Sequence, residues 1–213
     1  MSHVKEFSLL IEERHWIKGC KYIAGIDEVG RGALAGPVFA CAVIFEPYVY
    51  DARIKDSKRL TARARKEMSD QIHNLSRDWS IGIASVEEID RFNIRQATFM
   101  AMKRALYQLR LAPDLVLIDG NAIPGSKYEE IAVIDGDEKS FTIAAASILA
   151  KVKRDEFMSV LSANFPEYRF EKNKGYGTSD HILSIKKSGP TIQHRYSFLK
   201  KILNSADNWK SVE

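Results

Sequence analysis

The stretch from Tyr22 to Val38 constrains this chain most, because it joins a buried strand to two adjacent acids and a glycine-rich turn. The apolar run over residues 23–26 is typical of a buried strand, and Asp27 and Glu28 follow it directly. Because successive side chains of a strand point to opposite faces, Asp27 can face a site while Glu28 reaches it from the strand end. A second apolar strand is predicted over residues 38–45, at once after the turn.

The glycine-rich turn, residues 30–37, carries three glycines and one arginine between these two strands. Gly30, Gly32 and Gly36 let the backbone approach a ligand closely or adopt positive φ, which a Cβ atom would resist. Two acids and several glycines are, by themselves, equally typical of a solvated hairpin turn. These residues alone therefore do not distinguish a solvated turn from a functional site, and the rest of the chain is needed to do so.

The composition is that of a globular protein in a reducing compartment. The 213 residues are enough for one α/β domain with a buried core. The longest apolar run, residues 32–45, is too short to span a bilayer, and the charged N-terminus does not resemble a secretory signal. Cys20 and Cys41 lack the CxxC spacing of a zinc site. We therefore expect a cytoplasmic monomer without a membrane anchor.

Positive charge is concentrated in the C-terminal third. From Lys151 onward the chain has 12 Lys and Arg against 7 Asp and Glu, whereas the remainder has 20 against 21. A local basic surface beside acids suits a polyanion held near a metal site. It is more often a lysine-rich helix face in solvent, so charge alone does not identify a nucleic-acid partner.

Hydrophobic periodicity predicts a single α/β domain over residues 1–213. The predicted strands cover residues 23–26, 38–45, 79–86, 115–118 and 131–134, and the predicted helices cover 2–18, 61–73, 93–111, 141–161 and 178–187. Ser85 and Glu88 have the spacing of a capping box and open a short helical turn before the helix that starts at Asn93. An N-terminal helix (about 1–20) thus precedes the sheet, and a helical extension (about 165–213) follows it.

Three of the predicted strands end in acids: Asp27-Glu28, Asp119, and either Asp135 or Asp137. If these strands are neighbours in one sheet, the acids converge at one edge, where like charges raise each other's pKa. Such oxygen-rich sites suit Mg²⁺ or Mn²⁺, and two such ions can promote phosphodiester hydrolysis. One strand-end aspartate is often only a turn cap. Three of them after buried strands favour a metal site.

Two other kinds of chemistry fit the sequence poorly. The glycine-rich turn has the Gly-x-Gly spacing of a dinucleotide-binding turn, but Pro37 and a β-branched run follow where a helix should receive the pyrophosphate. Neither a P-loop nor a Gly-x-Ser-x-Gly elbow is present. The five histidines are expected in polar or helical surroundings, and Ser147 is more typical of a helix serine bonded to its own backbone. Acyl transfer is therefore not supported.

Six blocks of sequence occur in a fixed order over about residues 22–198. They are 25–32 with 34–38, 56–58, 117–121, 136–137 with 143–152, 154–155 and 174–178. In this order they resemble the type 2 ribonucleases H, specifically the bacterial ribonuclease HII family. The related type HIII enzymes carry an extra N-terminal domain, and only about twenty residues precede the first block, which favours HII. The resemblance implies an RNase H-like fold: a mixed central β-sheet flanked by helices, with a helical C-terminal extension.

The resemblance also implies the site residues. Its four metal-binding and catalytic acids fall on Asp27, Glu28, Asp119 and Asp137, which selects Asp137 over Asp135. Asp155 matches a frequent family residue, but we interpret it as a helix residue that pairs with Lys151.

Substrate-binding residues follow in the same way. The family's Gly-Arg-Gly element maps to Gly30, Arg31 and Gly32, and its backbone is implied to contact the ribose 2′-hydroxyl. Tyr176 matches a tyrosine implied to stack on the deoxyribose after a ribonucleotide. The lysines that could contact phosphates are Lys58, Lys172 and Lys174.

The implied activity is that of a metal-dependent endoribonuclease. It would hydrolyse the RNA strand of RNA–DNA hybrids and cut 5′ to ribonucleotides embedded in duplex DNA, as in ribonucleotide excision repair. The ends would be 3′-hydroxyl and 5′-phosphate, and the cofactor two Mn²⁺ or Mg²⁺ ions. The sequence departs from the family's usual residues at Ala33, Arg59, Asp135 and Tyr196. A non-catalytic nucleic-acid-binding module of the same fold and a Mg²⁺-dependent phosphotransferase are the alternatives.

Overall fold

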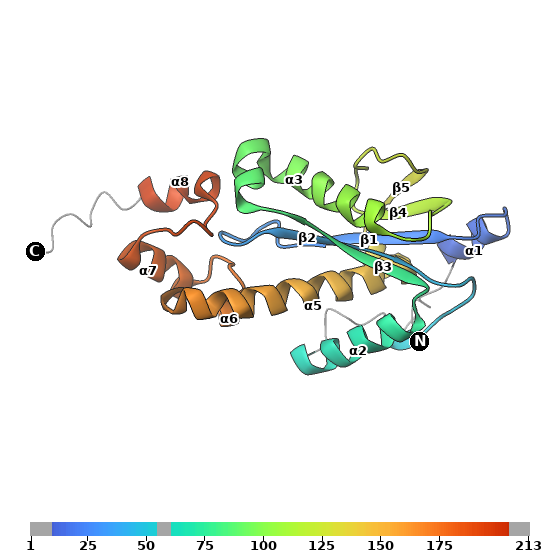
Figure 1. Cartoon of the computed structure of the whole chain (residues 1–213), viewed down its shortest axis with the longest axis horizontal. Coiled ribbons are helices and arrows are strands. Elements are labelled where there is room, and N and C mark those ends of the chain that lie inside the picture. Colours follow the sequence, from blue (N-terminus) through green and yellow to red (C-terminus); the bar gives the residue numbers. More distant parts are fainter. Residues whose placement is uncertain (1–9, 55–60, 205–213) are drawn as a thin grey trace, which may run out of the picture.

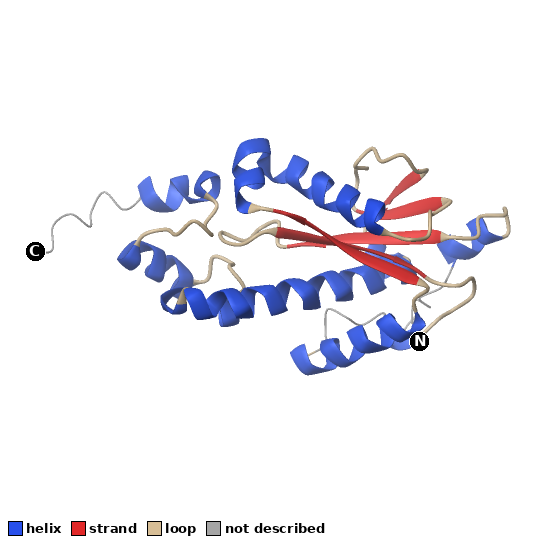
Figure 2. Ribbon diagram, in the orientation of Figure 1, coloured by secondary structure: helices blue, strands red, loops and turns tan. Residues whose placement is uncertain are grey.

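The structure, a computed structural model, describes residues 10–54 and 61–204, and its centre is a five-stranded sheet, which Figure 2 shows between the helices. The strands are β1 (Ile23–Val29), β2 (Val38–Ile44), β3 (Asp78–Ala84), β4 (Leu115–Asp119) and β5 (Glu130–Val133). Their order is β3-β2-β1-β4-β5. β1, β2 and β3 pair antiparallel, whereas β4 pairs parallel with both β1 and β5. The predicted mixed sheet is thus confirmed.

Helices cover both faces of this sheet, with α3 on one face and α2 and α5 on the other (Figure 1). The helices are α1 (Leu10–Trp16), α2 (Ala62–Leu75), α3 (Val86–Gln108), α4 (Gly136–Lys139), α5 (Phe141–Asn164), α6 (Phe170–Asn173), α7 (Ser179–Ser188) and α8 (Tyr196–Asn204). Because both faces are covered, the central strands are mostly apolar, and every residue of β2 is buried.

Alternation along β1 decides where its acids point. Ala24 and Ile26 pack against the core under α3, whereas Ile23 packs with Ile143 of α5. A Cβ atom on Gly25 would lie 2.2 Å from the carbonyl carbon of Thr142, so the backbone of α5 rests directly on β1. The same alternation directs Asp27 towards α5 and the next residue, Glu28, towards α3.

Local signals placed the helix ends well. The Ser85 capping box is present, and Asn93 interrupts α3 with φ 68° while its side chain accepts bonds from the amides of Arg95 and Gln96. Thr61 and Thr178 cap α2 and α7. The one-turn helices α4 and α6 match no individually predicted helix, although α6 lies within the expected helical extension, because four residues are too few to show a 3.6-residue period.

The C-terminal part contains the helices α6, α7 and α8, as predicted. α7 and α8 lie at one end of the molecule, beside the turn that joins β1 to β2 (Figure 1). Their core contains Met158, Tyr168, Phe170, Ile185 and Leu199. Within residues 10–54 and 61–204, no helix is long and apolar enough to cross a membrane.

Candidate active site

The acids Asp27, Glu28 and Asp119 form one group at the carboxyl ends of β1 and β4, which we call the acid cluster. β1 and β4 are parallel neighbours with Ile26 opposite Ile118, so the next residues, Asp27 and Asp119, lie beside each other where β4 ends. This is the convergence that the strand-end acids predicted.

Asp27 is the most deeply buried member, with 7% of its surface exposed. Burial raises its pKa well above the usual range, and the negative charges of Glu28 and Asp119 raise it further. A hydrogen bond from the Ser147 side chain and another from the Glu28 amide (2.7 Å) act in the opposite direction and lower the pKa. The carboxylate is thus held among like charges that the described residues only partly offset.

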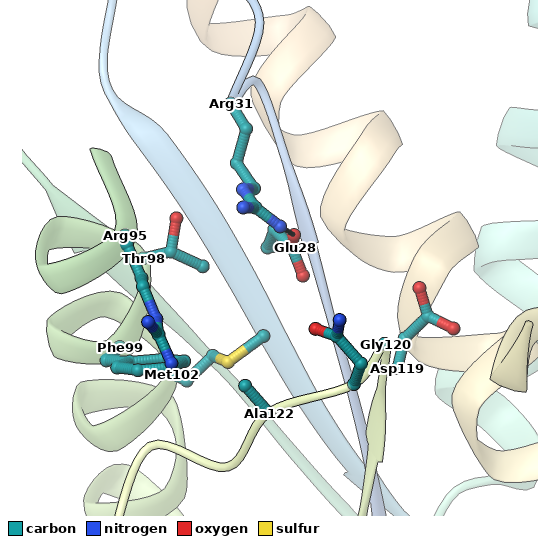
Figure 3. A pocket seen from close by; sticks show the side chains of 10 residues that line it. Glu28, Arg31, Arg95, Thr98, Phe99, Met102, Asp119, Gly120 and Ala122 are labelled. Atoms are coloured by element: carbon teal, nitrogen blue, oxygen red, sulfur yellow. Dashed lines mark hydrogen bonds and ion pairs between the residues drawn. The ribbon is translucent and has the colours of Figure 1, made fainter. Parts of the chain in front are cut away.

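Glu28 faces a cavity of about 350 Å³ that lies between β1, β4 and α3. Arg31 donates to Glu28 Oε1 at 2.9 Å, and Figure 3 shows its guanidinium directed at that carboxylate. Burial raises the pKa of Glu28, while Arg31 lowers it and Asp119 raises it. Arg95 and Phe99 of α3 line the opposite wall, with the guanidinium 5.6 Å from the ring centroid.

Asp137 is the second residue of α4, and the first residue of that helix bonds to the acid cluster. The Gly136 amide donates to Asp119 Oδ1 at 2.7 Å, which fixes the start of this helix on the end of β4. Asp135 is exposed, and its carboxylate lies 3.7 Å from Lys139. Among the described residues, no three His, Cys, Asp or Glu side chains are arranged as a ready metal site. The assignment of Asp137 as a ligand therefore stays a prediction.

The glycine-rich turn is bonded to two segments from the C-terminal part. The amides of Leu34 and Ala35 donate to the carbonyl of Gly175 at 2.7 and 3.2 Å. The Gly36 amide donates to the carbonyl of Gln193 at 2.8 Å. The turn that carries the Gly-Arg-Gly element therefore lies against the tyrosine turn, residues 174–176.

Tyr176 is half-buried rather than a free surface aromatic. Its ring centroid lies 5.4 Å from the guanidinium carbon of Arg154 and 5.8 Å from the ammonium of Lys151. Lys151 also pairs with Asp155 at 2.7 Å, as the sequence predicted.

The three predicted phosphate-binding lysines differ in their surroundings. Lys172 is exposed. Lys174 donates to Ser159 Oγ at 2.7 Å and to the Asp155 carbonyl at 3.3 Å, so it already has protein partners. Lys58 lies outside the described residues, as do Asp56, Ser57 and Arg59.

Sequence reasoning did not find two residues of this region, Arg154 and Arg195, which we call the arginine pair. Both side chains are fully buried and donate to carbonyl groups of the glycine-rich turn. Ser147 was also misjudged, because its side chain bonds to Asp27. It is the one polar residue in the apolar run over 143–150, a signal that could have marked it.

The expectation that all histidines lie in polar or helical surroundings was wrong for His194. His181 of α7 and His194 are both fully buried beside Tyr168 and Phe170, and their Nε2 atoms lie 3.1 Å apart. Nothing in the local sequence showed this, because the two residues meet only through the packing of α7 against the segment before α8.

Comparison with known proteins identifies the family. The family model described as Ribonuclease HII matches residues 24–201. The chain belongs to the ribonuclease HII family. A ribonuclease HII from Caldicellulosiruptor bescii is 46% identical over 194 residues, which are 91% of this chain and 94% of that protein.

Solved structures agree on the fold. The ribonuclease H2 from Pyrococcus horikoshii OT3 matches with a TM-score of 0.71 and 25% identity, over 88% of this chain and 99% of that one. Bst-RNase HIII in complex with Mn²⁺ matches with a TM-score of 0.66 and 20% identity, over 89% of this chain and 71% of that one. The RNase H-like fold is thus confirmed.

Membership of this family makes the chain a ribonuclease H, an endonuclease of a divalent-metal-dependent family that acts on RNA–DNA substrates. Of the interpretations that the sequence allowed, the nuclease is therefore confirmed, and the non-catalytic binding module and the phosphotransferase are not supported.

Proposed function

We propose that this ribonuclease H hydrolyses the RNA strand of RNA–DNA hybrids and also cuts on the 5′ side of ribonucleotides embedded in duplex DNA. The observation that carries the proposal is that the acid cluster continues directly into the glycine-rich turn. Asp27 and Glu28 are separated from Gly30, Arg31 and Gly32 by a single residue. One short segment therefore carries both the residues proposed for cleavage and those proposed to recognise the sugar. The products of the proposed reaction are 3′-hydroxyl and 5′-phosphate ends.

The acid cluster fits two hard divalent cations, Mn²⁺ or Mg²⁺. Carboxylate oxygens are the ligands that such ions prefer. Burial first, and then the negative charges of Glu28 and Asp119, raise the pKa of Asp27, so a cation would stabilise its charged form. We assign Asp27, Glu28, Asp119 and Asp137 as the residues that hold the ions. When bound, the ions supply the positive charge that stabilises the phosphodiester during cleavage. The Mn²⁺ complex of Bst-RNase HIII supports this choice of metal.

The glycine-rich turn is the proposed reader of the ribose. Arg31 and Gly32 are exposed, and a Cβ atom on Gly32 would meet no atom within 4 Å, so the backbone here is open to a ligand. A 2′-hydroxyl can both donate to and accept from backbone groups, which distinguishes RNA from DNA. Tyr176, held against this turn, is the proposed stacking partner of the next sugar.

The remaining walls of the site suit the duplex backbone. Arg95 brings a cation to the wall of the cavity that faces Asp119, and Lys172 is exposed near the tyrosine turn. Such contacts position a duplex without reading its sequence. We also propose that the enzyme acts in the cytoplasm as a monomer, in ribonucleotide excision repair. Its two cysteines are both free, which fits a reducing compartment.

The test uses the intact protein and three labelled substrates. These are a DNA duplex with one ribonucleotide, an RNA–DNA hybrid and an all-DNA duplex, each incubated with Mn²⁺, Mg²⁺ or a chelator. We expect cleavage of the first two only, with the cut in the mixed duplex mapping 5′ to the ribonucleotide and leaving a 3′-hydroxyl. No cleavage of the mixed duplex under either metal would overturn the proposal.

A further inference from the structure

We propose that Arg154 and Arg195 are positioning residues for ribonucleotide recognition, because their buried guanidinium groups fix the glycine-rich turn against the tyrosine turn. This inference rests on the function proposed above and names the residues that shape its recognition site. Arg154 comes from the middle of α5, and Arg195 directly precedes α8. Both approach the glycine-rich turn from elements more than a hundred residues away in sequence.

Arg154 bonds to both turns at once. Its Nε and Nη2 atoms donate to the carbonyls of Pro37 and Ala35, each at 3.1 Å, and its Nη1 donates to the carbonyl of Lys174 at 2.8 Å. The planar guanidinium presents donors in several fixed directions, which the ammonium of a lysine does not. One side chain therefore sets the distance between the two proposed recognition elements.

Arg195 holds the glycine-rich turn from its other end. Its Nε and Nη2 atoms donate to the carbonyl of Gly36 at 2.9 and 2.7 Å, and its Nη1 donates to the carbonyl of Arg31 at 2.9 Å. Arg31 is the middle residue of the Gly-Arg-Gly element. The peptide unit proposed to face the ribose is thus fixed on its inner side by a buried cation.

These contacts are unusual because backbone carbonyls, rather than carboxylates, are the hydrogen-bond partners of two buried charges. Within the described residues, the hydrogen bonds of both guanidinium groups go to backbone carbonyls, and the negative charges of Asp155 and Asp90 favour their charged forms without accepting a hydrogen bond from them. Burial lowers the pKa of both side chains, that of Arg195 to about 9. Charged donors form stronger hydrogen bonds than neutral ones, so the carbonyl groups offset much of the desolvation. If these arginines only filled space, apolar side chains of similar volume could replace them without the desolvation cost of a buried charge.

Two glycines make room for this arrangement. A Cβ atom on Gly30, which has φ +94°, would lie 2.2 Å from Arg154 Nε. A Cβ atom on Gly175, which has φ +81°, would lie 2.4 Å from the carbonyl oxygen of Ala35. The glycines therefore let Arg154 pass beneath the glycine-rich turn and let the two turns meet. The same guanidinium also lies under the ring of Tyr176.

The experiment replaces each arginine by lysine, which keeps the charge but loses the fork of donors. We compare cleavage of the duplex with one ribonucleotide to cleavage of the continuous hybrid, at temperatures where circular dichroism shows each variant folded. Arg154→Lys and Arg195→Lys are expected to lower the ratio of these two rates by at least about tenfold, since small misplacements of a binding group cost up to about a hundredfold. A ratio unchanged in both folded variants would overturn the inference.

Arg104→Lys is the matched control. Arg104 also donates to a backbone carbonyl, that of Ile83 at 2.6 Å, and pairs with Glu88, but it lies away from both turns. The Arg104→Lys variant should have a lower free energy of unfolding, but its ratio of mixed-duplex to hybrid cleavage should equal that of the wild type. An equal fall of the ratio in this control would assign the effect to general destabilisation and refute a positioning role.

A second measurement needs no variant. Hydrogen exchange of the wild-type protein should show the amides of residues 34–36 protected as strongly as those of α5, because the arginine pair holds their segment. Exchange as fast as in an exposed loop would contradict the inference even if the variants failed to fold. Failure of the wild type to cut the mixed duplex would instead count against the proposed function alone.

Discussion

The acid cluster and the arginine pair bury opposite charges on the two sides of one turn, and the protein treats them differently. The acid cluster crowds three carboxylates whose described partners leave the pKa of Asp27 and Glu28 raised. The arginine pair donates six hydrogen bonds to backbone carbonyls. The first arrangement costs stability until a cation arrives, whereas the second contributes to holding the fold.

This difference separates the reacting groups from the groups that position them. A charge left partly uncompensated can gain a great deal when an ion or substrate supplies the missing partner. A buried guanidinium whose three nitrogens all donate to carbonyls gains little from a ligand and instead fixes the backbone around it. Substitutions in both regions should therefore lower cleavage of the mixed duplex, but they should have opposite effects on metal-free stability.

The largest effect is expected from Asp27→Asn. The change removes one of the carboxylates proposed to hold the metal ions, so cleavage should fall at least about a thousandfold, equivalent to about 4 kcal/mol of transition-state stabilisation. It also removes a buried charge from among like charges. The melting temperature measured in a chelator should therefore stay equal or rise.

Asp135→Asn is the control for this prediction. Asp135 is exposed and pairs with Lys139, so its loss should leave cleavage within about twofold of the wild type, as for most surface substitutions. Asp137→Asn should behave like Asp27→Asn. Full activity of the Asp137 variant together with loss in the Asp135 variant would reverse the assignment, and a clear fall in metal-free stability of Asp27→Asn would make Asp27 a structural residue.

The next largest effect is expected in the Gly-Arg-Gly element, where Gly30 and Gly32 should respond differently to substitution by alanine. Gly30→Ala places a Cβ atom against Arg154 Nε at positive φ, so the free energy of unfolding should fall by about 3 kcal/mol. Gly32→Ala meets open space at ordinary φ, so its stability should stay within about 0.5 kcal/mol of the wild type. Chemical denaturation measures both.

Activity then completes the comparison of the two glycines. If the backbone at Gly32 meets the ribose, Gly32→Ala should cut the mixed duplex poorly despite its normal stability. Normal cutting by Gly32→Ala would contradict the proposed contact with substrate. Equal destabilisation by both substitutions would contradict the packing of Arg154 beneath the turn.

The acid cluster was predictable from the sequence for a physical reason. Buried strands are short apolar runs, and the residues that follow parallel neighbours meet at one edge, so Asp27 and Asp119 could be placed together before the sheet order was known. The glycine-rich turn was predictable because its motif is local. The break in α3 at Asn93 was also local, since the capping box and the following helix each have their own signal.

The arginine pair was not predictable, because its role exists only in three dimensions. Arg154 reaches Pro37 across 117 residues and Arg195 reaches Arg31 across 164. In the sequence, Arg154 belongs to the block 154–155 but was given no role, and Arg195 reads as an ordinary charged residue of a basic C-terminal part. The same limitation applies to His194, whose neighbours Tyr168 and His181 come from other elements.

The smallest effect concerns a pair of histidines behind the tyrosine turn. The Thr191 amide donates to His194 Nδ1, so the His194 Nε2–H group can donate to His181 Nε2, and His181 Nδ1–H can donate to the carbonyl of Tyr176. This chain requires both rings to be neutral, because a proton on either would set two N–H groups against each other. Burial lowers the pKa of His181, and burial together with His181 lowers that of His194 to about 4.

The sign of the pH dependence follows from this order of pKa values. Each folded-state pKa lies below the unfolded value of about 6.5, so the unfolded chain binds protons first as pH falls, and the stabilisation is complete above pH 6.5 and lost towards pH 4. Allowing for solvent screening, the free energy of unfolding should fall by about 2 kcal/mol over this window.

The acid cluster works in the opposite direction, because protonating carboxyl groups with raised pKa values increases the free energy of unfolding as pH falls. In a chelator, the free energy of unfolding of Asp27→Asn should therefore fall more steeply with decreasing pH than that of the wild type. His194→Gln should make this fall shallower. A flat profile of Asp27→Asn between pH 6.5 and 4.5 would show that the two histidines do not titrate as a buried neutral pair.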